Sequence, residues 1–401
     1  MTEWKTYKIG DLCKISSSKR IFAKEYKDSG IPFYRGKEII EKQKGNKIST
    51  ELYISQERYE EIKTKYGIPQ KGDMLLTSVG TLGIPYIVQD EVFYFKDGNL
   101  TWFYDFEGLD SRYLYYWFLS PIGKMNIDSK AIGSTQKALT IETLSKFEIS
   151  LPSLEEQRRI AGILGAIDDK IENNRRINTN LELQAQALFD EWISKSKTSK
   201  GVFNDIIQTT LAGDWGQETT QGNYTHEVYC IRGADIPSLR NGDKGKMPIR
   251  YILEKNYKAK QLRANDLVIE ISGGSPTQST GRICMITQSL LDRLAKDVVC
   301  TNFCRAITPK NGYAIYIYLY WLMLYNKNTM FSYENGTTGI KNLNIADLIS
   351  KEPIEIPAQE DVEKLNIVLQ PIFDQIYANG LQNETLATLR DTLLPKLMKE
   401  R

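Results

Sequence analysis

The most regular hydrophobic pattern of the chain is a stripe of side chains between residues 160 and 192. Its members follow one another at alternating steps of four and three residues, the spacing of the seam between two α-helices in a coiled coil. The stripe consists of Ile160, Leu164, Ile167, Ile171, Asn174, Asn178, Leu181, Ala185, Leu188 and Trp192. Ser153 and Glu156 precede it with the spacing of a capping box. We therefore expect a long amphipathic helix that begins near residue 153.

The same stripe recurs 205 residues later. Its members are Leu365, Leu369, Ile372, Ile376, Asn379, Asn383, Leu386, Arg390, Leu393 and Leu397. Both stripes carry two asparagines at their centre, and buried amides are satisfied best by one another. This favours pairing of the two helices over separate packing of each helix on its own globular domain. In an antiparallel pair Asn174 faces Asn383, and Asn178 faces Asn379. The spacing by itself also permits a parallel pair.

The rest of the chain repeats in the same order. The matching segments are 34–39 with 231–236, 71–76 with 264–269, 113–118 with 316–321, 133–135 with 336–338, and 151–152 with 356–357. Five matches in one order indicate two copies of a single unit, each a globular part followed by a helix. The expected domains are residues 1–153, 154–200, 201–357 and 358–401.

The two globular parts contain short β-branched and aromatic runs separated by Gly, Asn and Asp turns. These runs are 31–34, 74–79, 84–88 and 100–104, and then 228–231, 267–271, 283–286 and 298–307. Residues 109–119 and 314–325 have the composition of one helix in each copy. The expected fold is therefore α+β, with two mixed sheet and helix domains in a pseudo-twofold repeat joined by a long two-helix coiled coil.

Charge is distributed unevenly along the 401 residues. The totals of 52 Lys+Arg and 50 Asp+Glu leave a net charge of only +2. Residues 1–50, however, hold 12 basic and 6 acidic side chains, and residues 240–263 hold 8 and 2. One basic region can be an ordinary solvated surface, but two at related places in a repeat favour binding to the phosphate backbone of a nucleic acid.

Candidate DNA-binding residues lie in these regions and in the adjoining polar loops, since basic side chains hold phosphates and polar loops can read base edges. In the first copy they are Arg35, Lys37, Lys42, Lys44, Thr77, Ser78 and Lys137. In the second copy they are Arg232, Arg240, Lys244, Lys246, Arg250, Ser272, Gly273, Gly274, Ser275 and Lys341. Lys137 and Lys341 each follow a Gly-Ser/Thr-Thr turn, where they can hold a phosphate.

Sequence signals of catalysis are missing from the chain. It has neither a phosphate-binding G-x-x-x-x-G-K-[ST] loop nor a G-x-G-x-x-G turn, and it has a single histidine. The metal candidate, His226 and Cys230 with Cys300 and Cys304, has loose spacing and is better explained by buried cysteines. We expect a non-catalytic binding protein without a metal or cofactor of its own. The odd, irregular set of five cysteines and the polar beginning of the sequence are typical of a cytoplasmic protein.

Several segments resemble the specificity subunits of type I restriction-modification systems. Residues 151–164, continuing to 171, resemble the central region of these subunits, and residues 389–397 resemble their distal region. Residues 336–343 resemble the end of their recognition domains, and residues 133–139 are a looser copy. The resemblance spans the whole chain.

This resemblance implies two target recognition domains, each reading one half of a bipartite asymmetric site in double-stranded DNA. It implies an antiparallel coiled coil that docks two methyltransferase subunits, with restriction subunits joining the complex. S-adenosylmethionine, ATP and Mg would belong to those partners. The alternatives are a coiled-coil scaffold and a stand-alone DNA-binding or modification protein. Neither the target bases nor the spacer length follows from the sequence.

Overall fold

The computed structural model describes residues 4–43, 45, 48, 52–131, 137–274, 278–336 and 340–399. The chain divides into two compact units. Unit 1 comprises residues 1–172 and 386–401, and unit 2 comprises residues 173–385. The predicted domain boundaries stay predictions, because the compact units divide within the long helices and not at the ends of these helices.

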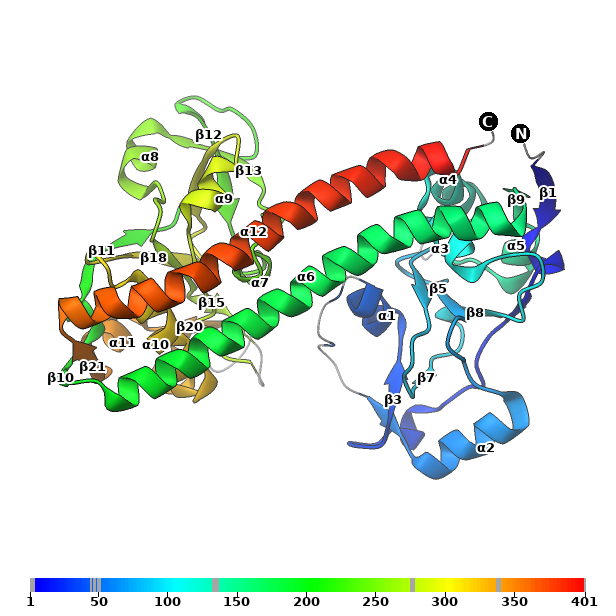
Figure 1. The fold of residues 1–401 in the computed structure, drawn as a ribbon, viewed down its shortest axis with the longest axis horizontal. Helices are drawn as coiled ribbons and strands as arrows, with labels where there is room; N and C mark the ends of the chain where they lie inside the picture. The colour runs from blue at the N-terminus through cyan, green and yellow to red at the C-terminus, as the bar shows by residue number, and fades with distance from the viewer. Residues whose placement is uncertain are drawn as a thin grey trace. The chain divides into compact units, whose positions relative to one another are not determined.

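Two long helices contribute to both units (Figure 1). They are α6 (Leu154–Lys195) and α12 (Gln359–Leu397), and they form what we call the helix pair. Helix α6 begins one residue after Ser153, whose hydroxyl accepts a hydrogen bond from the backbone N–H of Glu156 at 3.4 Å. The predicted start of the helix is therefore confirmed.

Polar contacts show that the helix pair is antiparallel. The amide Nδ2 of Asn174 donates to Asn383 Oδ1 at 2.9 Å, and Asn379 Nδ2 donates to Asn178 Oδ1 at 2.7 Å. The four asparagines are buried. Residue numbers thus rise along one helix as they fall along the other, which confirms the antiparallel arrangement that the sequence alone left open.

The globular part of unit 1 contains short strands and helices. The strands are β1 (Lys5–Lys8), β2 (Lys14–Ser16), β3 (Ile31–Tyr34), β4 (Tyr53–Ile54), β5 (Met74–Thr77), β6 (Pro85–Ile87), β7 (Tyr94–Phe95), β8 (Leu100–Tyr104) and β9 (Glu148–Leu151). The helices are α1 (Gly36–Gln43), α2 (Gln56–Tyr66), α3 (Ser111–Leu119), α4 (Pro121–Lys130) and α5 (Ile141–Ser145). They form sheets of order β1-β9, β2-β8-β5-β6 and β4-β3-β7.

Unit 2 repeats this architecture. Its strands are β10 (Thr198–Gly201), β11 (Ile207–Ala212), β12 (Tyr224–Ile231), β13 (Ile249–Leu253), β14 (Leu267–Glu270), β15 (Ser272–Gly273), β16 (Ile283–Met285), β17 (Asp297–Cys300), β18 (Cys304–Pro309), β19 (Glu334–Asn335), β20 (Lys341–Leu343) and β21 (Ile354–Pro357). Its shorter helices are α7 (Ile236–Arg240), α8 (Glu254–Lys260), α9 (Gln288–Asp292), α10 (Ala314–Asn326) and α11 (Ile345–Lys351).

The sheets of unit 2 have the order β10-β21, β11-β18-β14-β16 and β13-β12-β17, with a further small sheet β15-β20-β19. The sheets β4-β3-β7 and β13-β12-β17 each combine one antiparallel and one parallel pairing. The matching strand order confirms the internal repeat and the α+β fold. None of the helices in the described part of the chain combines the length and apolarity needed to cross a membrane.

One predicted strand is wrong. The run 298–307 is divided into β17 and β18, and the turn between them exposes Asn302 and Phe303. The division is physically necessary because β17 pairs with β12 in one sheet while β18 pairs with β14 in another.

The seam of the helix pair departs from the prediction near the end of α6. Leu188 is 40% exposed, whereas Ala185 and Phe189 are completely buried. At this end α6 packs against the core of unit 2, where Phe189 contacts the rings of Tyr316 and Tyr320. A globular core follows the 3.6-residue period of a straight helix, so the buried position moves from 188 to 189.

The other predicted seam positions differ in how deeply their side chains are buried. The buried ones are Ile160, Leu164, Ile167, Ile171, Asn174, Asn178, Leu365, Leu369, Ile376, Asn379 and Asn383. Leu181, Ile372, Leu386 and Leu393 are partly buried. Ile160 and Leu164 also belong to the core of unit 1, and Leu365 and Leu369 to the core of unit 2. The helices therefore pack both on each other and on the globular parts.

Candidate nucleic-acid interface

In unit 2, the polar loop after the buried strand β14 is held beside two other segments. The backbone N–H groups of Ile271 and Ser272 donate to the carbonyl of Phe303 at 2.9 and 3.2 Å. On its other side, strand β15 pairs with β20, so that Gly273 lies opposite Lys341. The structure thus brings the candidate Lys341 beside the candidates Ser272 and Gly273, which precede it in the chain by 69 and 68 residues.

Unit 1 builds the same arrangement from its own copy of these segments. The N–H of Ser78 donates to the carbonyl of Asn99 at 2.9 Å, and the N–H of Leu139 donates to the carbonyl of Ser78 at 2.9 Å. Val79 forms an antiparallel bridge with Ala138. Asn99 therefore occupies the place of Phe303, and Lys137, which is exposed, lies beside the loop as Lys341 does in unit 2.

The segments beside the loop of unit 2 present apolar side chains to solvent. Phe303 is 57% exposed and Ile340 is 63% exposed. Gly274 is exposed and has a φ of +74°, where a Cβ would lie 2.9 Å from the carbonyl oxygen of Gln278. Glycine therefore allows this turn to form. Ser275 lies outside the described residues.

Lys341 does not extend into solvent. Its Nζ lies 3.1 Å from Glu334 Oε2 and 4.5 Å from the centre of the Phe331 ring. Ser272 likewise donates its hydroxyl proton to Asn342 Oδ1 at 2.5 Å. These contacts order the small sheet and fix the backbone that carries the exposed residues.

Sequence reasoning missed Phe303 because it treated residues 298–307 as one strand. The signal was the polar pair Thr301-Asn302, which interrupts the apolar run at the turn. For Asn99, the comparable sequence signal of a turn is the preceding glycine, Gly98, which adopts a φ of +72° in the structure.

The Arg-Gly turns are local ion pairs rather than exposed contacts. Arg35 donates from its backbone N–H and its guanidinium to the carboxylate of Glu38, at 2.6 to 3.1 Å. Arg232 binds Asp235 in the same way at 3.0 to 3.1 Å. Burial alone would raise the pKa of Glu38, but the Arg35 guanidinium and two backbone N–H groups lower it below the ordinary value.

The basic region of unit 2 is largely engaged within the protein. Arg240 binds Glu182 and Lys244 binds Glu384, and both acids belong to the helix pair. Arg250 is 7% exposed, pairs with Glu218 and lies 3.7 Å from the centre of the Trp215 ring. The remaining candidate, Lys246, has an exposed side chain.

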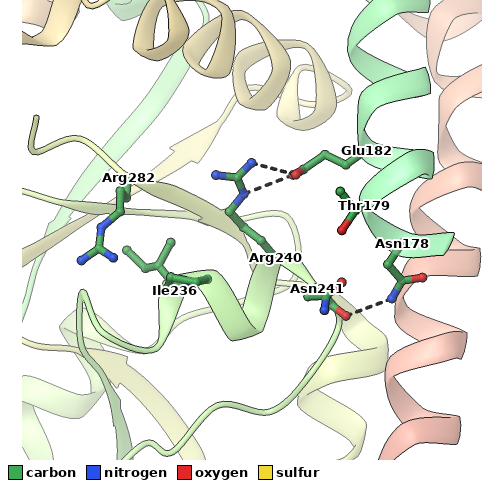
Figure 2. A pocket seen from close by; sticks show the side chains of 8 residues that line it. Asn178, Thr179, Glu182, Ile236, Arg240, Asn241 and Arg282 are labelled. Atoms are coloured by element: carbon green, nitrogen blue, oxygen red, sulfur yellow. Dashed lines mark hydrogen bonds and ion pairs between the residues drawn. The ribbon is translucent and has the colours of Figure 1, made fainter. Parts of the chain in front are cut away.

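A pocket of about 240 Å³ lies where this region meets helix α6 (Figure 2). It is lined by Asn178, Thr179, Glu182, Ile236, Pro237, Arg240, Asn241 and Arg282. Arg282 is bound to the buried Glu270 at 2.6 and 2.7 Å. Two arginines thus border the pocket, and each is neutralised by a carboxylate of the chain.

The candidates of unit 1 are also divided between interior and surface. Thr77 and Ser78 are buried, contrary to the expectation of an exposed reading loop. The Thr77 hydroxyl accepts a hydrogen bond from the backbone N–H of Ile84 at 2.9 Å, and the backbones of both residues pair with neighbouring segments. Lys42 binds Glu91 at 2.6 Å between the rings of Tyr34 and Tyr86.

The two remaining basic candidates in the first 50 residues are Lys37 and Lys44. Lys37 is exposed. Lys44 lies outside the described residues, as does most of the turn before Lys137.

The residues of the metal candidate do not converge. Both ring nitrogens of His226 contact carboxylates, Glu254 at 2.8 Å and Asp297 at 3.0 Å. Burial raises the pKa of Cys230 to about 12 and that of Cys304 to about 11. Within the described ranges, no three His, Cys, Asp or Glu side chains lie together as a metal ion requires.

A family model described as "Type I restriction modification DNA specificity domain" matches residues 1–183 and matches again at residues 219–386. The chain belongs to this family. Two matches in one chain confirm the repeat, and this chain therefore carries two DNA specificity domains.

The chain is similar to specificity subunits of type I restriction enzymes and to one solved structure of such a subunit. It is 28% identical to the type I restriction enzyme MjaIX specificity subunit of Methanocaldococcus jannaschii, over 99% of this chain and 93% of the relative. It is 22% identical to the HindI specificity subunit of Haemophilus influenzae, over 69% of this chain and 73% of the relative. The crystal structure of the type I restriction-modification S subunit from M. genitalium shows the same fold, with a TM-score of 0.54 and 16% identity over 100% of this chain and 97% of that chain. A specificity subunit selects a DNA sequence and is not itself an enzyme.

Proposed function

We propose that each globular part reads one half of a bipartite asymmetric site in double-stranded DNA. The surface that reads it is formed by the loop after β5 in unit 1, or after β14 in unit 2, and by the segments that hydrogen-bond to this loop. The observation that carries this proposal is the recurrence of one backbone arrangement with different side chains. Asn99 and Phe303 occupy the same place beside the two loops. An amide suits hydrogen bonding to adenine, whereas an apolar ring suits a thymine methyl group or a wedge between bases. Two such faces select two different half-sites.

Exposed lysines near these faces are the proposed phosphate contacts. Lys137 in unit 1 and Lys246 in unit 2 have exposed side chains. Contacts of this kind bind any sequence and hold the protein in place on the duplex, so the choice of bases falls to the loops.

The helix pair is the proposed docking surface for two methyltransferase subunits. Ile163 on α6 is 36% exposed, and Val368 on α12 is 55% exposed. These positions are equivalent, since they differ by the 205 residues of the helical repeat. An exposed apolar side chain at equivalent positions of the two helices fits two copies of one partner. Restriction subunits would join through this complex in the cytoplasm. S-adenosylmethionine, ATP and Mg would be bound by the partners.

The decisive experiment is co-expression with the methyltransferase subunit, followed by mapping of the methylated bases. Residues 201–357 are then exchanged for those of another specificity subunit. We expect one half of the methylated motif to change and the other half to stay. A change in both halves would contradict the modular assignment.

Two simpler measurements separate the alternatives. A scaffold that does not contact DNA would show no steep loss of duplex affinity with rising salt, whereas phosphate contacts require that loss. A stand-alone modification enzyme would bind S-adenosylmethionine as an isolated chain, and we expect no such binding.

A further inference from the structure

The basic segment that begins at the last residue of helix α7 lies against both helices of the helix pair. Arg240 donates from Nε and Nη2 to the two carboxylate oxygens of Glu182 on α6, at 3.1 and 2.7 Å (Figure 2). The hydroxyl of Tyr318 on α10 donates to the same carboxylate at 2.6 Å. Glu182 is therefore shared by two elements of the globular part. The side chains of Arg240 and Glu182 are only 27% and 24% exposed.

The next residues continue this contact toward α12. Asn178 Nδ2 donates to the carbonyl oxygen of Asn241 at 3.0 Å. Gly242 then passes so close to α12 that a Cβ atom at Gly380 would lie 2.0 Å from the Gly242 carbonyl oxygen. Only a glycine at position 380 permits this approach.

A second ionic contact lies one helical turn further along α12. Lys244 Nζ and Arg293 Nη1 each lie 3.1 Å from a carboxylate oxygen of Glu384. Arg293 also donates to the carbonyl of Gly242 at 2.9 Å. The contacts of residues 240–244 with α6 and α12, which we call the anchor, thus bind one loop to both helices beside the central asparagines.

The counterparts of Arg240 and Glu182 in unit 1 carry no charge. The position of Arg240 is taken by Gln43, which contacts Tyr115, the counterpart of Tyr318, at 3.5 Å. The counterpart of Glu182, 205 residues later on α12, is Ala387. The ion pair therefore belongs to the second copy alone among these equivalent positions, and the fold of the repeat does not require it.

We propose that the anchor is a positioning device for the second recognition domain, and that Glu182 and Arg240 hold this domain in the orientation that its half-site requires. The inference rests on the proposed function. A bidentate arginine–carboxylate pair fixes direction as well as distance. Loss of the Arg240–Glu182 ion pair frees the domain to tilt on the helix pair. Its loops are then no longer aligned with the base edges of the half-site.

The test uses the full complex with methyltransferase subunits and compares the wild type with Glu182→Gln. Methylation rates are measured on the target duplex and on duplexes with one wrong base pair in either half-site. A wrong base pair lowers the affinity of a protein–DNA interface by roughly ten- to a hundredfold. We expect Glu182→Gln to lose discrimination in the second half-site by about tenfold, part of that cost, while discrimination in the first half-site is unchanged.

Two further variants separate positioning from folding. The exchange Glu182→Arg with Arg240→Glu restores the pair in reverse and is expected to recover discrimination. Glu191→Gln removes an exposed pair with Lys195 on the same helix and should change nothing. Thermal unfolding shows whether each variant is folded.

Equal loss in both half-sites, or full discrimination by folded Glu182→Gln, would overturn the inference. The proposed function fails differently, since a domain exchange in the wild type would then change both half-sites or neither.

Discussion

Arg35 and Arg232 close equivalent turns by binding a carboxylate three residues later in the chain. The partners Glu38 and Asp235 are almost fully buried, at 1% and 2% exposure. A buried carboxylate without a partner is costly. The pair thus has a structural role at the start of each recognition face. In unit 1 it also makes stability dependent on pH, because the pKa of Glu38 is lowered.

Replacing Glu38 by Gln should lower the free energy of unfolding at pH 7 by roughly 1–3 kcal/mol, the usual cost of losing such charged hydrogen bonds. Because the folded-state pKa of Glu38 is lowered, its contribution is present above the unfolded-state pKa and is lost as the pH falls through the folded-state pKa. The deficit of the variant should therefore shrink in acid.

Denaturant unfolding at pH 7 and at several pH values below the ordinary glutamate pKa of about 4.3 measures this deficit. Glu142→Gln, which removes an exposed pair with Lys146, is the control and should cost little at any pH. A deficit that does not change with pH would contradict this role for Glu38.

Phe303 should determine the preference for one base pair. Phe303→Ala is expected to relax the methylated motif at a single position in the half-site of the second domain, by roughly 1–3 kcal/mol of discrimination. Sequencing of methylated DNA gives the result. Asn302→Ala, at the neighbouring exposed position, is the matched comparison. An unchanged motif in Phe303→Ala would place Phe303 outside the DNA interface.

At the scale of elements, the helix pair combines apolar ends with a polar centre. The four central asparagines form specific hydrogen bonds across the pair. Toward either end the helices contribute instead to two globular cores. Polar pairing sets the register and apolar packing supplies most of the stability.

The antiparallel register can be tested by crosslinking. Leu393 packs against the cluster that contains Leu164. Cysteines at positions 164 and 393 should therefore form a disulfide under mild oxidation, whereas cysteines at positions 164 and 369, which a parallel pair would bring together, should not. The five native cysteines are buried, so they are not expected to compete. Non-reducing gels after proteolytic cleavage between the two positions distinguish the outcomes. A crosslink to position 369 would refute the antiparallel register in solution.

At the scale of the whole molecule, each compact unit contains part of both long helices, and the units divide at residues 172–173 and 385–386. Helix length is therefore expected to decide which spacing between half-sites the protein accepts. A heptad adds about 10 Å to a helix, which corresponds to roughly three base pairs of DNA.

A heptad inserted after both Glu172 and Thr385 should lengthen the accepted spacer by about three base pairs. Both helices must be extended so that the register of the asparagines is kept. Methylation of a library of sites with varied spacers provides the measurement. Insertion in one helix only is the control, and it should impair assembly. An unchanged spacer in the doubly extended protein would exclude this role of the helices.

The sequence by itself determined the elements whose signal is periodic or repeated. The stripe with its central asparagines predicted both long helices and their partners, and the ordered matches predicted the repeat and the α+β class. Such patterns are local in sequence, and each long helix shows the same periodicity over many turns. The family resemblance was also carried by contiguous segments.

Only the tertiary structure decided which charged and polar residues face solvent. Arg240 and Lys244 are the kind of residues that bind phosphate. They instead form ion pairs in the anchor with Glu182 and Glu384, which are more than 55 residues away in the chain. Thr77 is buried, and Phe303 is exposed by a turn between two sheets. Composition shows that a charge exists, but its partner depends on long-range packing, which no local pattern records.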